Sequence, residues 1–266
     1  MLLAGPVGWL VVAYLGSLAI LFVASLWQLD DFSGKIVHET GFQNFKELAQ
    51  TPVYRSIVGR TVLIAALVTL TDAILAFPIA FYMAKVASPR RRSLLVVAVL
   101  MPLWASYLIK AYSWRLILSD GGVLDWLLAP FGLKGPGFGD IAMWLVFTYL
   151  WLPYMILPIY AGLERIPDSL LEASADLGGH AWTTFRRVIL PMSTPAVIAG
   201  SIFTFALTLG DYIVPGLVST SQFIGNVIVI NVAQDLPLAA AYSLVPLAII
   251  LIYLLVARRL GAFNAL

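Results

Sequence analysis

The chain has 266 residues, of which 61% are hydrophobic and only 11% are charged, whereas globular domains carry about 25% charged residues. This composition, with a mean hydropathy of +0.93, excludes an ordinary globular domain and predicts an all-α, polytopic membrane protein. A net charge of +2 is too small to favour a nucleic-acid partner, and the absence of cysteine excludes disulfides, thiolate metal sites and cysteine nucleophiles.

Six segments reach the roughly 20 apolar residues that a membrane-spanning helix requires. They cover residues 7–27, 61–84, 93–118, 141–163, 193–218 and 238–257. The first segment lacks the basic region and the small-residue cleavage site of a signal peptide, so we interpret it as a span. We expect one domain over residues 1–266, with its core at 56–258, a peripheral first helix at 7–27 and a long connection at 164–191.

Basic residues gather in three of the segments outside these spans, whereas the other loops mix acidic and basic residues. The basic set is Lys85, Arg90, Arg91, Arg92, Arg165, Arg186, Arg187, Arg258 and Arg259. Loops rich in Lys and Arg stay on the cytoplasmic side of a membrane. The sequence therefore predicts that the 164–191 connection and both termini are cytoplasmic.

Two formal charges, Asp72 and Lys110, fall inside the second and third predicted spans. Charges at membrane depth are costly, so they usually pair with each other or face a cavity. Adjacent spans run antiparallel, and at about 1.5 Å of rise per residue the two charges differ in depth by roughly 5 Å. Two hypotheses follow: a structural Asp72–Lys110 ion pair, or an Asp72 that attracts a cation or a proton along a transport pathway.

Four aromatic residues gather at the outer end of the third predicted span: Trp104, Tyr107, Tyr112 and Trp114. Trp and Tyr are enriched at membrane interfaces, and they also line cation pathways. Both interpretations remain open for Trp114, and the pathway interpretation is favoured for Tyr107.

The sequence of the 164–191 connection predicts two short helices joined by glycines. Ser169 and Glu172 have the spacing of a capping box, and Gly178 suits the end of the first helix. A second helix should follow, with the chain re-entering the membrane at Pro191.

The fifth predicted span contains a polar break. Asp211 follows Gly210 and precedes Pro215, a combination that favours an interrupted helix. Interrupted helices are tolerated at membrane depth where they line a cavity. A carboxylate beside Tyr212 suits an ammonium group by charge and by cation–π contact. A simple cap on the broken helix is the alternative.

The 164–191 connection resembles the EAA loop of ABC importer permeases. That pattern reads Glu-Ala-Ala, three residues, Gly, nine residues, Ile, any residue, Leu-Pro. Five residues match it at the required spacing: Glu172, Ala173, Gly178, Leu190 and Pro191. Ser174 and Val188 depart from the pattern by small changes. The resemblance implies that this loop, including Asp176, is the coupling helix that docks on an ATPase subunit. A helical hairpin with no partner is the alternative.

Three further stretches, at 43–48, 102–114 and 209–215, are similar to regions of spermidine/putrescine-type permeases. The similarity extends over nearly the whole chain and is greater to the first of the two permease subunits in such systems. It implies the type I fold of ABC importer permeases and the uptake of a small organic cation, with a polyamine favoured over another small solute carried by this branch. The substrate pathway would then include Asp211, Tyr212, Tyr107, Trp104, Asp72 and Lys110.

The same resemblance implies partners. ATPase subunits would bind ATP and Mg²⁺, because this chain has no Walker motif and needs no cofactor or metal of its own. A second permease subunit, expected to be a different chain, and a soluble substrate-binding protein would complete a system in the lipid of a bacterial inner membrane.

Two other classes of protein fit the sequence less well. An ATP-independent secondary transporter would need an internal inverted repeat or a homodimer, and the sequence shows no convincing repeat. An intramembrane enzyme would need a nucleophile–base or metal constellation, yet both histidines, His38 and His180, fall outside the predicted spans. We therefore expect a transport subunit and not an enzyme.

Overall fold

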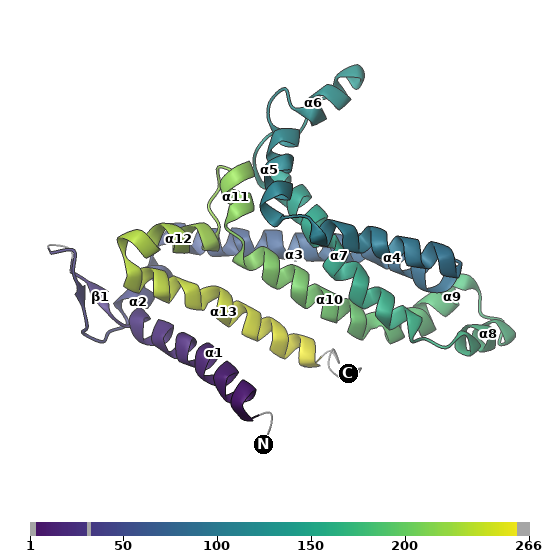
Figure 1. Cartoon of the computed structure of the whole chain (residues 1–266), viewed down its shortest axis with the longest axis horizontal. Helices are drawn as coiled ribbons and strands as arrows, with labels where there is room; N and C mark the ends of the chain where they lie inside the picture. Colours follow the sequence, from purple (N-terminus) through teal and green to yellow (C-terminus); the bar gives the residue numbers. More distant parts are fainter. Residues whose placement is uncertain (1–3, 31–32, 260–266) are drawn as a thin grey trace.

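The computed structural model describes residues 4–30 and 33–259, most of which are helical (Figure 1). The longer helices are α1 (Ala4–Ser25), α3 (Pro52–Phe81), α4 (Pro89–Trp104), α5 (Tyr107–Leu118), α7 (Asp140–Glu164), α10 (Leu190–Gly210), α12 (Ile224–Gln234) and α13 (Leu236–Arg259). The shorter helical segments are α2 (Gln43–Gln50), η1 (Tyr82–Val86), α6 (Val123–Leu128), η2 (Ala129–Phe131), α8 (Asp168–Asp176), α9 (Ala181–Thr184), η3 (Phe185–Ile189) and α11 (Ile213–Val218). Strands β1 (Gln28–Leu29) and β2 (Ile36–Val37) pair antiparallel between α1 and α2.

Within the described residues, five helical stretches are long and apolar enough to cross a membrane, and one bent pair forms a sixth candidate. The five are Gly5–Ser25, Pro52–Val86, Asp140–Glu164, Ala181–Gly210 and Leu236–Arg259. They overlap five of the six predicted spans, although the helix of the fifth ends at Gly210 and not at residue 218. The prediction of an all-α, polytopic membrane protein is therefore confirmed.

The third predicted span is not one straight helix. α4 and α5 meet at an angle of 89°, so residues 93–118 form a bent pair that is a candidate for one broken span. The two residues between them are extended, with ψ of 140° at Ala105 and 132° at Ser106. Pro102 lies in the last turn of α4 and cannot donate the hydrogen bond that would extend the helix regularly. The ammonium of Lys110 donates to the Pro102 carbonyl at 3.0 Å and so links α5 to the end of α4.

The core lies where α3, α7 and α10 run side by side through the middle of the molecule (Figure 1). Small side chains on α3, including Ala65, Ala76 and Ala80, are fully buried and let the helices approach closely. α7 and α10 touch at Gly200, where an added Cβ would lie 2.8 Å from the sulfur of Met155. These helices therefore form the closely packed core of the fold.

The ends of the helices divide the molecule into two sides. In Figure 1, α3, α7 and α13 run toward the side that carries α8 and α9, whereas α1 and α10 run away from it. The start of α1 and the end of α13 consequently lie on the same side as the 164–191 connection. The hairpin β1–β2, α2, α5 and α6 lie toward the opposite side.

Candidate functional site

The interrupted helix at Asp211 is the first element of the site. α10 stops at Gly210, and Asp211 is extended, with φ −75° and ψ 139°. Its Oδ1 accepts the N–H groups of Ile213 at 2.8 Å and Val214 at 2.9 Å. A carboxylate that accepts the first backbone N–H groups of a helix caps that helix. The predicted break in the helix is confirmed. Asp211 also caps the helix that follows, which was the alternative role considered for this residue.

The second oxygen of the same carboxylate connects α10 to α5. Asp211 Oδ2 accepts a hydrogen bond from the hydroxyl of Tyr107, the first residue of α5. The Tyr107 ring stacks on Trp151 of α7, with centroids 5.9 Å apart and planes 9° apart. Trp151 in turn meets Tyr154 edge-on at 5.9 Å. Three helices therefore hold one carboxylate beside a cluster of aromatic rings.

This arrangement borders a hollow of about 360 Å³. Its lining residues are Tyr107, Trp151, Ala206, Leu207, Gly210, Asp211, Tyr212 and Ile213. The carboxylate already accepts three hydrogen bonds, and a carboxylate offers about four acceptor positions. About one position remains for a donor on a ligand. A carboxylate next to aromatic faces suits an organic ammonium ion better than an anion.

The other aromatic residues of the predicted pathway are not equally placed. Tyr212 lines the hollow, and its carbonyl accepts the side-chain amide of Asn226 at 2.8 Å. Trp104 is 79% exposed at the end of α4 and is not among the described residues that line the hollow. Sequence reasoning missed Trp151, which resembles the other apolar residues of its span, and Asn226, which lies between two predicted spans where no helix was expected.

Asp72 and Lys110 do not form the ion pair that was one of two hypotheses. Asp72 is fully buried in α3, and among the described residues neither of its carboxylate oxygens has a hydrogen-bond partner. The pairing is wrong because the bend before α5 removes Lys110 from the antiparallel arrangement that the prediction assumed. The buried hydroxyl of Thr69, one turn away, bonds to the Ala65 carbonyl at 2.7 Å. Asp72 therefore remains a candidate pathway residue.

The 164–191 connection forms the second part of the candidate site. α8 begins at Asp168 after an extended Pro167, and no side chain among the described residues caps it. The predicted capping box is wrong because the proline starts the helix one residue before Ser169. Gly178 ends the helix with φ +78°. The N–H groups of Gly178 and Gly179 bond to the carbonyls of Ala175 at 2.9 Å and Ser174 at 2.8 Å, as in a Schellman motif.

Most motif residues of α8 face away from the protein. Glu172, Ala173, Asp176 and Gly178 are exposed, and Leu177 is 89% exposed. The hydroxyls of Ser174 and Thr184 lie 2.8 Å apart and join α8 to α9. The loop thus has a defined shape with an accessible outer face.

Leu190 and Pro191 lie in a different setting from the one expected. One continuous helix runs over Ala181–Gly210, so the chain does not turn at Pro191. The π-helical turn η3 precedes it, with the Leu190 N–H bonded to the Phe185 carbonyl. Such a turn shifts the hydrogen-bond register and accommodates a residue that has no N–H. Both Leu190 and Pro191 are exposed.

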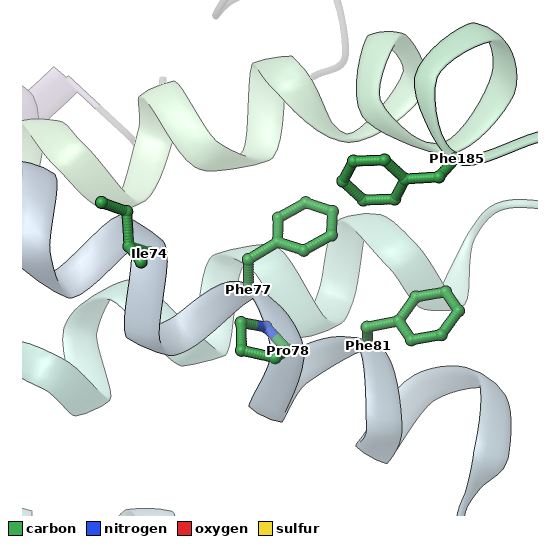
Figure 2. A pocket seen from close by; sticks show the side chains of 5 residues that line it. All are labelled: Ile74, Phe77, Pro78, Phe81 and Phe185. Carbon is green, nitrogen blue, oxygen red and sulfur yellow. The ribbon is translucent and has the colours of Figure 1, made fainter. Parts of the chain in front are cut away.

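A second hollow of about 400 Å³ lies between α3 and η3. Figure 2 shows its lining, Ile74, Phe77, Pro78, Phe81 and Phe185, with the rings of Phe77 and Phe185 turned toward each other. Their centroids are 5.5 Å apart in an edge-on arrangement. All five residues are apolar, so this hollow lacks the negative charge of the Asp211 site.

Comparison with known proteins places the chain in context. Residues 48–264 match the family described as "Binding-protein-dependent transport system inner membrane component". The chain is 44% identical to the inner membrane ABC transporter permease protein YdcU of Escherichia coli, over 100% of this chain and 90% of that protein. It is 31% identical to the spermidine/putrescine transport system permease protein PotB of Escherichia coli, over 90% of this chain and 88% of that protein.

Solved structures resemble the fold. A bacterial ABC transporter involved in the import of the polysaccharide alginate matches with a TM-score of 0.75 and 19% identity, over 98% of this chain and 94% of that chain. The MetNI methionine ABC transporter, in inward-facing conformations, matches with a TM-score of 0.61 and 14% identity, over 78% of this chain and 94% of that chain. The fold is therefore that of ABC importer permeases.

Proposed function

This chain belongs to the family of binding-protein-dependent transport system inner membrane components, and we propose that it carries a small organic cation, most simply a polyamine. Membership makes the chain the membrane-spanning permease subunit of an ABC importer and not an enzyme. It is a multi-pass protein of the inner membrane.

The observation that carries the cation proposal is the Asp211 carboxylate in its aromatic hollow. A polyamine loses hydration when it enters such a hollow, and a carboxylate in a medium of lower dielectric offsets part of that loss. The cation–π faces of Tyr107, Trp151 and Tyr212 add to the attraction. The names of the PotB relatives, which are spermidine/putrescine permeases, support the same class of solute.

Asp72 is proposed as a second pathway residue. Its unpaired carboxylate would be costly in a closed core, and such groups usually mark a route for a cation or a proton. In this proposal it becomes accessible when the helices rearrange during transport. Lys110 and Trp104 lie near the bend between α4 and α5, and their part in the pathway stays a prediction.

The outer face of α8 supports the second proposal, that the 164–191 connection is the coupling loop. Glu172, Ala173, Asp176 and Gly178 would contact an ATPase subunit, and ATP and Mg²⁺ would bind there and not on this chain. Leu190 and Pro191, at the start of α10, would contact the same ATPase subunit. A second permease subunit, expected to be a different chain, and a soluble binding protein would complete the complex.

The proposed orientation places α8, the start of α1 and the end of α13 on the cytoplasmic side. The basic residues at that end support it, because they follow the positive-inside rule. Transport would proceed by alternating access. ATP binding would close the ATPase dimer and move the coupling loops together, and hydrolysis would return the cavity to the inward-facing state.

The direct test is Asp211→Asn in vesicles that contain the chain and its co-purified partners. Asparagine retains an acceptor for the N–H groups of Ile213 and Val214, so the helix cap stays while the charge is lost. We expect uptake of labelled spermidine or putrescine to fall about tenfold, the effect of losing one hydrogen bond to a charged group.

The matched control is Asp120→Asn, which removes an exposed carboxylate outside the hollow and should leave uptake unchanged. Wild-type uptake by Asp211→Asn would show that this residue is a helix cap alone, and the cation proposal would lose its main support.

A further inference from the structure

The corner where α7 leads into α8 is held by Lys85 of η1. Its ammonium donates to the Ile166 carbonyl at 2.6 Å and to Asp168 Oδ1 at 2.7 Å. These two acceptors flank Pro167, where α8 changes direction. The Lys85 side chain is only 10% exposed, and the hydrogen bond that it donates lowers the pKa of the Asp168 carboxyl. The Asp168 carboxyl is therefore ionised at neutral pH, and its contact with Lys85 ties the direction of α8 to η1 at the end of α3.

Arg92 makes a second connection at the same corner. Its Nε donates to the Met83 carbonyl at 3.1 Å and its Nη2 to the Ala84 carbonyl at 2.9 Å. These carbonyls lie at the end of a helix, where the last C=O groups need partners from outside. Nη1 donates to Glu164 Oε1 at 3.2 Å, at the last residue of α7. One guanidinium thus joins α4 to η1 and α7.

α4 leads from this corner to the Asp211 site. None of its 16 residues, all of which the structure describes, is fully buried, and Leu95, Val96 and Val99 contact the core while partly exposed. It spans about 24 Å at the usual helical rise. Beyond the 89° bend the next helix begins with Tyr107, whose hydroxyl bonds to Asp211. α4 therefore connects the corner directly to the helix that carries Tyr107.

We propose that Lys85 and Arg92 are positioning residues that join α8, the end of α7 and the start of α4 into one rigid corner, through which movement of α8 reaches Tyr107 and Asp211. The proposal rests on the proposed function, in which an ATPase subunit moves α8. Neither residue belongs to the motif that the sequence shares with coupling loops. In this account α4 acts as a lever between the ATPase contact and the cation site.

The first test measures the rigidity of the corner. The chain contains no cysteine, so spin labels can be attached to Arg90→Cys on α4 and Ala175→Cys on α8 without removing native thiols. Both positions are exposed. With Lys85 intact, we expect a narrow distribution of distances between the labels in the full chain in lipid nanodiscs. Lys85→Met should broaden it, and Lys134→Met, on an exposed outer loop, should not. Identical distributions with Lys85 intact and in the Lys85→Met variant would overturn the proposal.

The second test separates coupling from folding in the assembled complex. Lys85→Met should retain the co-purified ATPase and its basal ATP hydrolysis, yet lower the solute transported per ATP at least about tenfold, because it removes both hydrogen bonds that the ammonium donates. Lys85→Arg should recover most of the ratio, because a guanidinium can also bond to Ile166 and Asp168. A Lys85→Met complex that assembles less but transports normally per ATP would mean a structural role only and would overturn the proposal.

The two proposals fail in different ways. If no ATPase co-purifies with the wild-type chain, the proposed function fails, and the label distances alone decide whether the corner is rigid. If the wild-type complex couples transport to hydrolysis and Lys85→Met couples equally well, only the lever proposal fails.

Discussion

The carboxylate of Asp211 caps a helix and is also the group that we propose attracts the cation. It caps α11 through Ile213 and Val214, and it accepts the Tyr107 hydroxyl at the edge of the hollow. The break and the charge could be predicted from Gly210, Asp211 and Pro215, because those residue types disfavour a continuous helix locally. The hydrogen bond from Tyr107 could not be predicted from the sequence, because it depends on the angle between α4 and α5. Residues that act through local backbone chemistry are readable from sequence, whereas partners across the fold are not.

Gly178 provides a residue-scale prediction for the proposed coupling loop. Its φ of +78° lies in the left-handed region, which proline cannot adopt because its ring holds φ near about −65°. Gly178→Pro should therefore disrupt the end of α8 and abolish ATP-driven uptake while the chain still inserts. Uptake and retention of the ATPase during purification are the measurements.

Glu172→Lys tests the same loop without a backbone change. The side chain is exposed, so the substitution inverts a charge at the proposed contact and should weaken ATPase retention. Glu39→Lys, also exposed but on the opposite side, serves as the control. Wild-type retention and uptake in both Gly178→Pro and Glu172→Lys would remove the coupling interpretation.

At the scale of helices, apolar runs predicted where the chain crosses a membrane but not whether a crossing is straight. Residues 93–118 have the length of one span, yet two extended residues after Pro102 turn the chain by 89°. At Pro191, by contrast, the helix continues, because the π-helical turn η3 before it accommodates a residue that has no N–H. A proline restricts the hydrogen bonds available nearby, and the packing of neighbouring elements decides between a bend and a π turn.

The packing of α7 against α10 leads to a stability prediction. An added side chain at Gly200 would press on Met155, so Gly200→Leu should destabilise the protein by about 1–3 kcal/mol, the usual cost of overpacking. The midpoint of thermal unfolding in detergent should fall. Gly8→Leu in α1 is the control, because an added Cβ there meets nothing within 4 Å. Equal midpoints for both variants would contradict a close α7–α10 contact.

At the scale of the whole molecule, exposed apolar surface is extensive. α1 lies beside α13 and is exposed along most of its length, and α4 has no buried residue among its described positions (Figure 1). In a membrane subunit such surfaces are covered by lipid or by other subunits. The sequence predicted this class of protein from composition alone, whereas the packing of α3, α7 and α10 emerges only from the fold.

The orientation of the molecule can be tested directly. A reporter fused at Arg91 should be cytoplasmic, and one fused at Gly135 should be external, because the basic ends of the helices stay inside. Arg91 lies at the start of α4, and Gly135 lies between η2 and α7. Reversed labelling would place α8 beyond the reach of a cytoplasmic ATPase.

The central claim is that this permease carries organic cations at the expense of ATP hydrolysed by a partner. The most direct measurement is solute uptake by vesicles containing the chain with its co-purified partners, with and without ATP. The panel would contain labelled spermidine, labelled putrescine, a neutral sugar and an acidic sugar. We expect ATP-dependent accumulation of at least one polyamine and none of either sugar. ATP-dependent accumulation of a sugar with no polyamine uptake, or uptake that does not require ATP, would contradict the account.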